Sequence, residues 1–229
     1  MNDLIYIVED EQDIADLIAL HLTKAGFTVE TFSSLHSFTG RMEQKHPKLI
    51  LLDLMLPDGD GLEACKELKR NEETKSIPVV MVTARGDEID RILGLEIGAD
   101  DYIPKPFSVR ELTARIKNLI KRSYPHTESG GDSSVMLTDE IQIETNRHVV
   151  LVDGKDIGLT ATEFNILLYM ARHRGWVFTR EQILDHLWGD EKAVLDRTVD
   201  VHIKHIREKM EPYGDLVKNI RGVGYKLDL

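Results

Sequence analysis

Short apolar runs alternate with amphipathic segments through the first half of the chain. Five of the runs have the length and composition of strands: Leu4–Val8, Phe27–Phe32, Leu49–Leu52, Val79–Val82 and Tyr102–Ile103. The segment from Asp13 to Ala25 carries its apolar residues on one helical face and is followed by Gly26. Strands that alternate with helices predict an α/β fold, a doubly wound five-stranded parallel sheet covered on both faces.

The second half begins with short alternating segments and continues with three helical patterns and a hairpin. The alternation extends from Val135 to Gly158 around an Asp153-Gly154 turn signal. Capping signals predict three helices: one at Thr160–Arg172, one that begins at Thr179-Arg180-Glu181-Gln182, and one at Asp196–Met210. Strand-like segments at Val217–Ile220 and Tyr225–Leu227 predict the final hairpin. This order predicts an α+β domain that ends in a hairpin.

A linker separates the two patterns. Residues 123–134 (SYPHTESGGDSS) contain proline, glycine and serine without periodicity, so we expect a flexible connection. The predicted domains are therefore residues 1–122 and residues 135–229. A chain of 229 residues is long enough for two cores, and 41% hydrophobic with 30% charged residues is typical of a globular protein.

Composition also bears on compartment and partners. We found no membrane-length apolar run and no signal-peptide pattern, so we expect a cytoplasmic protein with no membrane partner. Cys65 is the only cysteine, which excludes an intrachain disulfide. The net charge of -11 argues against nucleic-acid binding by the chain as a whole, but residues 197–226 hold seven Lys/Arg against four acids. A local basic face remains compatible with DNA.

Chemistry-bearing side chains follow the predicted strands. Glu9 and Asp10 follow the first strand and Asp53 the third, and the carboxyl ends of parallel strands form ligand sites. An all-oxygen set of acids suits Mg²⁺. Thr83 and Lys105 follow later strands, which would let Asp53 attack a phosphoryl donor while cations offset the charge. Each residue alone is more often a cap, a turn or a surface side chain, so the ordered combination carries the hypothesis.

The segments VEDE, LLDLMLPDGDG, VVMVTAR, GADDYIPKPF and RELTARI together resemble a receiver domain, which has a flavodoxin-like fold. The resemblance implies that Asp53 accepts the phosphoryl group and that its carboxylate, Glu9, Asp10 and the Met55 carbonyl hold Mg²⁺. It further implies that Thr83 and Lys105 contact the phosphoryl group, that Tyr102 changes exposure on activation, and that the Lys105-Pro106 bond is cis.

Three helices and a basic hairpin in the second domain are typical of a winged helix-turn-helix. In the third helix, Val199, Ile203 and Ile206 are spaced for burial. The side chains expected on its other faces are Arg197, Asp200, Lys204 and Arg207. Arg221 lies between the hairpin strands, where Gly222 and Gly224 allow a close approach to a minor groove. Trp176 and Trp188 are expected in the core rather than as base-stacking platforms.

The segments LTATEFNILLYMARHRGWVFTREQIL, DRTVDVHIKHIREKM and NIRGVGYKL resemble the DNA-binding domain of the OmpR/PhoB family. The resemblance implies a DNA-binding set of Arg197, Thr198, His202, Lys204, His205, Arg207, Arg221, Gly222 and Tyr225. Arg197, Thr198 and His202 match backbone contacts, and His205 and Arg207 match positions that face the major groove. His205 stands where some relatives have arginine, and histidine does not make the bidentate contact of arginine to guanine.

The resembled family dimerises through the region between Asp87 and Lys121. Its charged residues predict an interface of Arg91, Asp100, Asp101, Glu111 and Arg115. Arg91 with Glu111, or Asp101 with Arg115, would pair across a two-fold axis. Phosphorylation would shift Thr83 and Tyr102 and favour this dimer.

The predicted function is that of a two-component response regulator and transcription factor, not an enzyme. Expected partners are a sensor histidine kinase, double-stranded DNA and a second copy of the chain on activation, with RNA polymerase as a further candidate. Three alternatives stay open at this point: an aspartyl-phosphate hydrolase, a phosphorylation-independent regulator and a winged-helix protein that binds another protein. The hydrolase would need a second Asp two residues after Asp53, where this chain has Met55.

Overall fold

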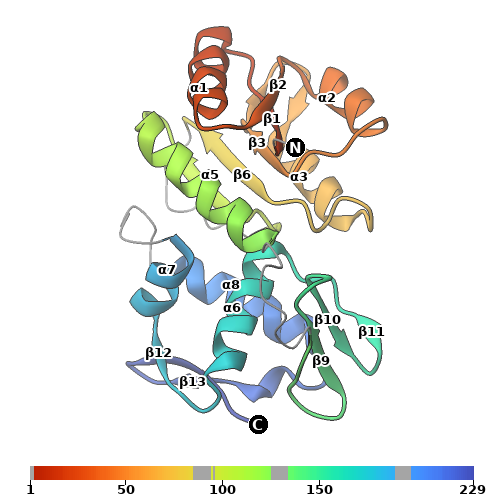
Figure 1. Ribbon diagram of the computed structural model, residues 1–229, viewed down its shortest axis with the longest axis vertical. Coiled ribbons are helices and arrows are strands. Elements are labelled where there is room, and N and C mark those ends of the chain that lie inside the picture. The colour runs from red at the N-terminus through yellow and green to blue at the C-terminus, as the bar shows by residue number, and fades with distance from the viewer. Residues whose placement is uncertain (1–2, 85–93, 95, 125–133, 189–196) are drawn as a thin grey trace. The chain divides into compact units, whose positions relative to one another are not determined.

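The computed structural model describes residues 3–84, 94, 96–124, 134–188 and 197–229 (Figure 1). The chain divides into two compact units, Met1–Ile120 and Lys121–Leu229. The predicted linker overlaps the end of a helix at Ser123 and the start of a strand at Ser134, and most of it lies outside the described residues. The predicted boundaries of the domains stay predictions.

The first unit is built on a five-stranded parallel sheet with strand order β2-β1-β3-β6-β7. Its strands are β1 (Leu4–Val8), β2 (Thr28–Phe32), β3 (Leu49–Leu52), β6 (Val79–Thr83) and β7 (Asp101–Pro104), with a small hairpin of β4 (Met55–Leu56) and β5 (Gly59–Asp60). Its described helices are α1 (Gln12–Lys24), α2 (Leu35–Met42), α3 (Gly61–Arg70) and α5 (Val109–Ser123). The predicted α/β fold is confirmed.

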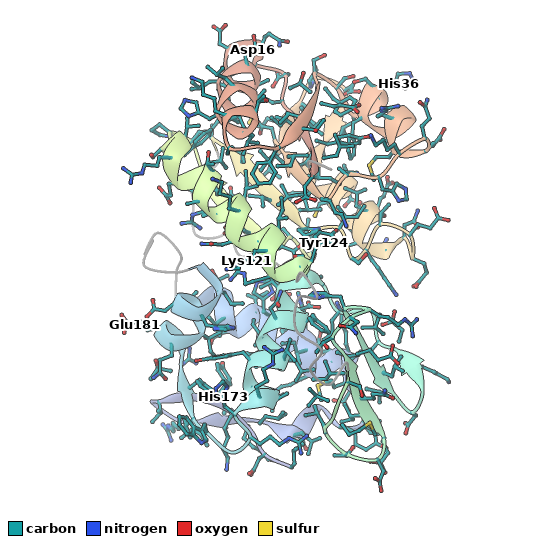
Figure 2. The ribbon with its side chains drawn as sticks, in the orientation of Figure 1. Asp16, His36, Lys121, Tyr124, His173 and Glu181 are labelled. Atoms are coloured by element: carbon teal, nitrogen blue, oxygen red, sulfur yellow. The ribbon has the colours of Figure 1, made fainter. Side chains whose placement is uncertain are left out.

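Helices cover both faces of this sheet, and as a result every residue of β1, β3 and β6 is buried. Phe38 and Met42 of α2 and Cys65 of α3 pack in one core with Tyr6 and Ile50. Helices α1 and α5 lie over the opposite face (Figure 1). Polar side chains such as Asp16 on α1 and His36 on α2 point outward (Figure 2). Burial raises the pKa of the Cys65 thiol to about 12.

The second unit begins with an antiparallel sheet of order β11-β10-β9-β8 and ends with a three-stranded sheet of order β12-β14-β13. The strands are β8 (Ser134–Met136), β9 (Ile141–Glu144), β10 (Val149–Val152), β11 (Lys155–Asp156), β12 (Phe178–Thr179), β13 (Val217–Ile220) and β14 (Gly224–Leu227). The helices are α6 (Ala161–Arg172), α7 (Arg180–Trp188), α8 (Arg197–Lys209) and the 3₁₀ turn η1 (Gly214–Leu216). This arrangement confirms the predicted α+β domain.

Capping signals in the sequence mark two of these helices. Thr160 and Glu163 form a reciprocal capping box at the start of α6. Thr179 and Gln182 bond reciprocally at the start of α7, where the Gln182 amide donates to the Thr179 hydroxyl and the Thr179 amide donates to the Gln182 side chain. The predicted cap at Asp196 lies outside the described residues.

The prediction for Trp176 was wrong, because its side chain is 66% exposed. Trp176 follows Gly175 in the turn between α6 and β12, and Phe178 fills the core from this segment instead. The side chain of Trp188 lies outside the described part of the structure. Across the described residues, no helix combines the length and the hydropathy needed to cross a membrane.

Candidate functional site

Three carboxylates meet at the carboxyl end of the parallel sheet. Glu9 directly follows β1 and Asp53 directly follows β3, and the register of these strands sets Val8 beside Leu52. Glu9, Asp10 and Asp53 each offer one oxygen within 4.8 Å of the others. Glu9 and Asp53 are buried and Asp10 is exposed. This all-oxygen set, open on one side, has the chemistry that suits a Mg²⁺ ion.

Lys105 closes the group from the end of β7. Its ammonium nitrogen lies 2.8 Å from Glu9 Oε1, 2.8 Å from Asp53 Oδ2 and 3.5 Å from Glu11 Oε1. The Lys105-Pro106 peptide bond is cis, as predicted. A cation thus lies beside the carboxylate that was predicted to accept a phosphoryl group.

Burial and charge shift the pKa values of this cluster. Burial, reinforced by the negative charge of Asp53, raises the pKa of Glu9 to about 7, against the opposing hydrogen bond from Lys105. For Lys105, burial by itself lowers the pKa, but the bonds and charges of Asp53 and Glu9 outweigh it and raise the pKa. Lys105 is therefore a fixed cation near neutral pH.

Sequence reasoning missed Glu11, which lies at the N-cap position of α1. Its side chain makes no capping bond and reaches toward Lys105 instead. The third acid in the VEDE segment was the available signal. Asp58 was also missed: its carboxylate accepts the backbone N–H groups of Leu35 and His36 and so caps α2.

The remaining predicted receiver residues lie around this cluster. Thr83 is fully buried at the end of β6, and Tyr102 is buried on β7 beside Met81. The Met55 amide donates to Asp53 Oδ1 at 3.1 Å, and the Met55 side chain is exposed. A Cβ atom at Gly61 would overlap the Asp53 carbonyl oxygen, so the loop after β3 depends on a glycine there.

The four described residues of the predicted dimer interface already have charged partners within the chain. Arg115 lies 3.1 Å from Asp101 and 2.9 Å from Glu111, and both pairs are intramolecular. Asp100 is fully buried and lies 2.7 Å from Lys69. The adjacency of β7 and α5 brings the first pair together, which an argument from sequence spacing did not anticipate. Arg91 lies outside the described residues.

Helix α8, the predicted recognition helix, buries Val199, Ile203 and Ile206 as expected. Lys204 is exposed. Arg207 is directed inward, since its Nε and Nη2 atoms donate to the Val217 carbonyl at 2.8 and 2.6 Å.

Glu163 of α6 ties the end of this helix to the core. Its carboxylate lies 2.7 Å from Lys209 Nζ and 3.3 Å from His205 Nδ1, and it is fully buried. Burial by itself raises the pKa of Glu163, but the bonds to His205 and Lys209 outweigh it and lower the pKa to about 2. The His205 side chain is therefore directed toward Glu163 of α6 in this structure.

Three other residues of the predicted DNA-binding set are buried. The exposed fractions are 5% for Thr198, 1% for His202 and 4% for Tyr225. Arg197 begins α8, and its side chain lies outside the described part. Side-chain contacts of the three buried residues with DNA would need movement, and these contacts stay predictions.

The turn between β13 and β14 presents Arg221 and Gly222 to solvent. Gly222 has a φ of 74°, a conformation that favours glycine. A Cβ atom at Gly224 would overlap the Phe178 carbonyl oxygen, so this glycine allows β14 to pack on β12. The turn is the wing of the predicted winged helix.

Comparisons with known proteins match both units. Residues 5–117 match the family described as response regulator receiver domain, and residues 154–227 match the one described as transcriptional regulatory protein, C terminal. The chain is 41% identical over 227 residues to the sensory transduction protein RegX3 of Mycolicibacterium smegmatis, with 98% of each chain covered. It is 42% identical over 224 residues to the phosphate regulon transcriptional regulatory protein PhoB of Escherichia coli, covering 97% of this chain and 96% of the relative.

Solved structures agree with these matches. The response regulator DrrB of Thermotoga maritima, an OmpR/PhoB homolog, is 31% identical with a TM-score of 0.53 and full coverage of both chains. A mutant of the protein RitR is 25% identical with a TM-score of 0.75 and 99% coverage of both chains.

Proposed function

Because the chain belongs to the OmpR/PhoB family of two-component response regulators, which are transcription factors and not enzymes, we propose that phosphorylation of Asp53 controls its binding to DNA. The observation that carries the proposal is the group formed by Glu9, Asp10, Asp53 and Lys105. It combines a nucleophilic carboxylate, further oxygen ligands and a fixed cation.

In the proposed reaction, an Asp53 carboxylate oxygen forms a bond to phosphorus while the bond from phosphorus to the donor breaks. The donor is a phosphohistidine of a sensor kinase or a small acyl phosphate. Lys105, 2.8 Å from Asp53, is placed to offset the charge on the transferred group. Glu9, Asp10, Asp53 and the Met55 carbonyl would hold Mg²⁺, which supplies further charge neutralisation when bound.

Response to the phosphoryl group is assigned to Thr83 and Tyr102. Both side chains are buried, so a change at either one requires repacking of neighbouring side chains. We assign dimerisation to the surface of β7 and α5 together with Arg91. The pairs of Arg115 with Asp101 and Glu111 lie within the chain here, so pairing across a two-fold axis would require these bonds to exchange.

The second unit is proposed to bind double-stranded DNA through α8 and the wing. Lys204 and Arg221 are exposed and are the first candidates for contact with DNA. Arg197, Thr198, His202, His205, Arg207, Gly222 and Tyr225 complete the proposed set. The proposed compartment is the cytoplasm, with a sensor histidine kinase and RNA polymerase as partner proteins.

The test compares the wild-type chain with Asp53→Ala, each with and without acetyl phosphate and Mg²⁺. Intact mass spectrometry would detect the added phosphoryl group, sedimentation would report dimerisation, and gel retardation would report binding to duplex DNA. We expect all three responses in the wild type and none in Asp53→Ala. Equal DNA binding by both proteins under all conditions would instead support a phosphorylation-independent regulator.

A further inference from the structure

Three side chains in the second unit join both helices of the helix-turn-helix to the wing. Arg180 opens α7, Asp200 lies in the first turn of α8, and Tyr225 lies on β14. Arg180 Nε donates to Asp200 Oδ1 at 2.6 Å, and the Tyr225 hydroxyl donates to the same oxygen at 2.8 Å. Arg180 Nη2 donates to the Tyr225 hydroxyl oxygen at 3.2 Å. We call these residues the Asp200 triad.

The triad occupies the hydroxyl of Tyr225. A phenol has one proton to donate, and here it goes to Asp200. Burial, with the bond to Asp200, raises the pKa of Tyr225, so the hydroxyl keeps its proton. While the triad is closed, Tyr225 has no proton to donate to a DNA phosphate. Its hydroxyl acts as a link between strand and helix.

Arg180 differs from Tyr225 in this respect. A guanidinium carries five N–H groups, and the triad uses two of them. Among the described residues, the guanidinium has no other hydrogen-bond partner. Its central carbon lies 5.0 Å from the centre of the Tyr225 ring, which further fixes its orientation. The side chain is 28% exposed and stands at the N-terminus of α7, where the helix dipole favours an anion.

We propose that Asp200 is a positioning residue for DNA binding, which orients Arg180 toward a backbone phosphate and holds β14 against α8. The inference rests on the proposed binding of DNA by this unit. It also predicts that the loss of the Asp200 charge changes the affinity for DNA in the direction opposite to that expected from charge alone. Removal of a negative charge from the recognition helix should strengthen binding to a polyanion, whereas loss of a positioning carboxylate should weaken it.

The test measures binding of the full-length chain to a labelled random-sequence duplex at a series of salt concentrations. Glu208→Gln is the matched control, because Glu208 is an exposed acid on the same helix outside the triad. We expect Asp200→Asn to weaken binding about fivefold and to lower the slope of log affinity against log salt by about one. Glu208→Gln, which removes the same charge, should bind at least as tightly as the wild type.

Tyr225→Phe provides a second variant that leaves the surface charge unchanged. It retains the pair of Arg180 with Asp200, so we expect weaker binding by about twofold and an unchanged salt slope. Thermal melting would check that each variant is folded. If Asp200→Asn is not folded, the binding of Tyr225→Phe alone decides the test. Wild-type affinity in both variants would overturn the inference and leave the proposed function standing. Failure of the wild-type chain to bind any duplex would overturn both.

Discussion

The polar groups of the two units are arranged in opposite ways. In the first unit, the acids Glu9, Asp10 and Asp53 outnumber the one lysine, Lys105, that is bonded to Glu9 and Asp53. In the second unit, the residues of the Asp200 triad bond to one another, and Glu163 bonds to its own partner Lys209. The first arrangement leaves negative charge that the chain itself does not balance, while the second pairs its carboxylates with cations of the same unit.

This difference matches the proposed division between a phosphoryl-transfer site and a DNA-recognition surface. A phosphoryl-transfer site needs excess charge held in place before its ligand arrives. A DNA-binding surface gains affinity from exposed cations held in fixed positions, which is the role proposed here for Lys204 and Arg221. The internal bonds between helix and wing are proposed to hold these positions fixed. The predictions below test which of these side chains stabilise the fold and which do not.

The largest effect is expected for Asp100→Ala. This buried carboxylate accepts bonds from Lys69 Nζ and the Val79 amide, and its loss would leave the buried ammonium with carbonyl partners but without a counter-charge. We expect the free energy of unfolding of the first unit to fall by about 4 kcal/mol, measured by urea denaturation. Glu67→Ala, an exposed acid on the same helix as Lys69, should change it by less than about 0.5 kcal/mol. Equal losses would show that Asp100 is not a structural residue.

A smaller loss is expected for Glu163→Ala in the second unit. The substitution removes half of the capping box and a buried partner of Lys209. Since the Lys209 side chain is 32% exposed, water would compensate part of the loss, and we expect about 3 kcal/mol. Denaturation followed by circular dichroism measures the change, with Glu208→Ala as control. An unchanged midpoint would mean that α6 and α8 do not depend on this carboxylate.

The open acidic cluster should make stability depend on pH. The pKa of Glu9 is about 7 in the folded chain and 4.5 ordinarily, so between these values the folded chain holds a proton that the unfolded chain has released. In Mg²⁺-free buffer, the unfolding free energy of the first unit should therefore fall as the pH rises from about 4.5 to about 7. Glu9→Gln should flatten this part of the profile. A profile identical to the wild type would contradict the assignment to Glu9.

The smallest effect is expected for Trp176→Ser. With 66% of the side chain exposed, its replacement should change the unfolding free energy by less than about 0.5 kcal/mol. Thermal melting measures the effect. A loss of unfolding free energy as large as that for Glu163→Ala would show that the Trp176 side chain packs in the core.

The sequence predicted the first site better than the second for a physical reason. Strand ends in a parallel sheet lie at one edge, so residues such as Asp53 and Lys105 meet once the strands are assigned. A position on a helix only limits the direction of a side chain. The partner of Arg207 is a carbonyl on β13, and the partners of Asp200 are on α7 and β14. Local spacing in the sequence reveals none of these contacts. Trp176 was misplaced because size alone does not decide burial.

The isolation of Cys65 has a practical consequence. This single thiol is fully buried and its pKa is about 12, so almost none of it is the reactive thiolate at neutral pH. A maleimide dye would therefore react with a cysteine introduced at an exposed position and leave Cys65 unlabelled. One such cysteine in each unit would allow the distance between the units to be followed by fluorescence energy transfer as a phosphodonor is added, without prior removal of the native cysteine.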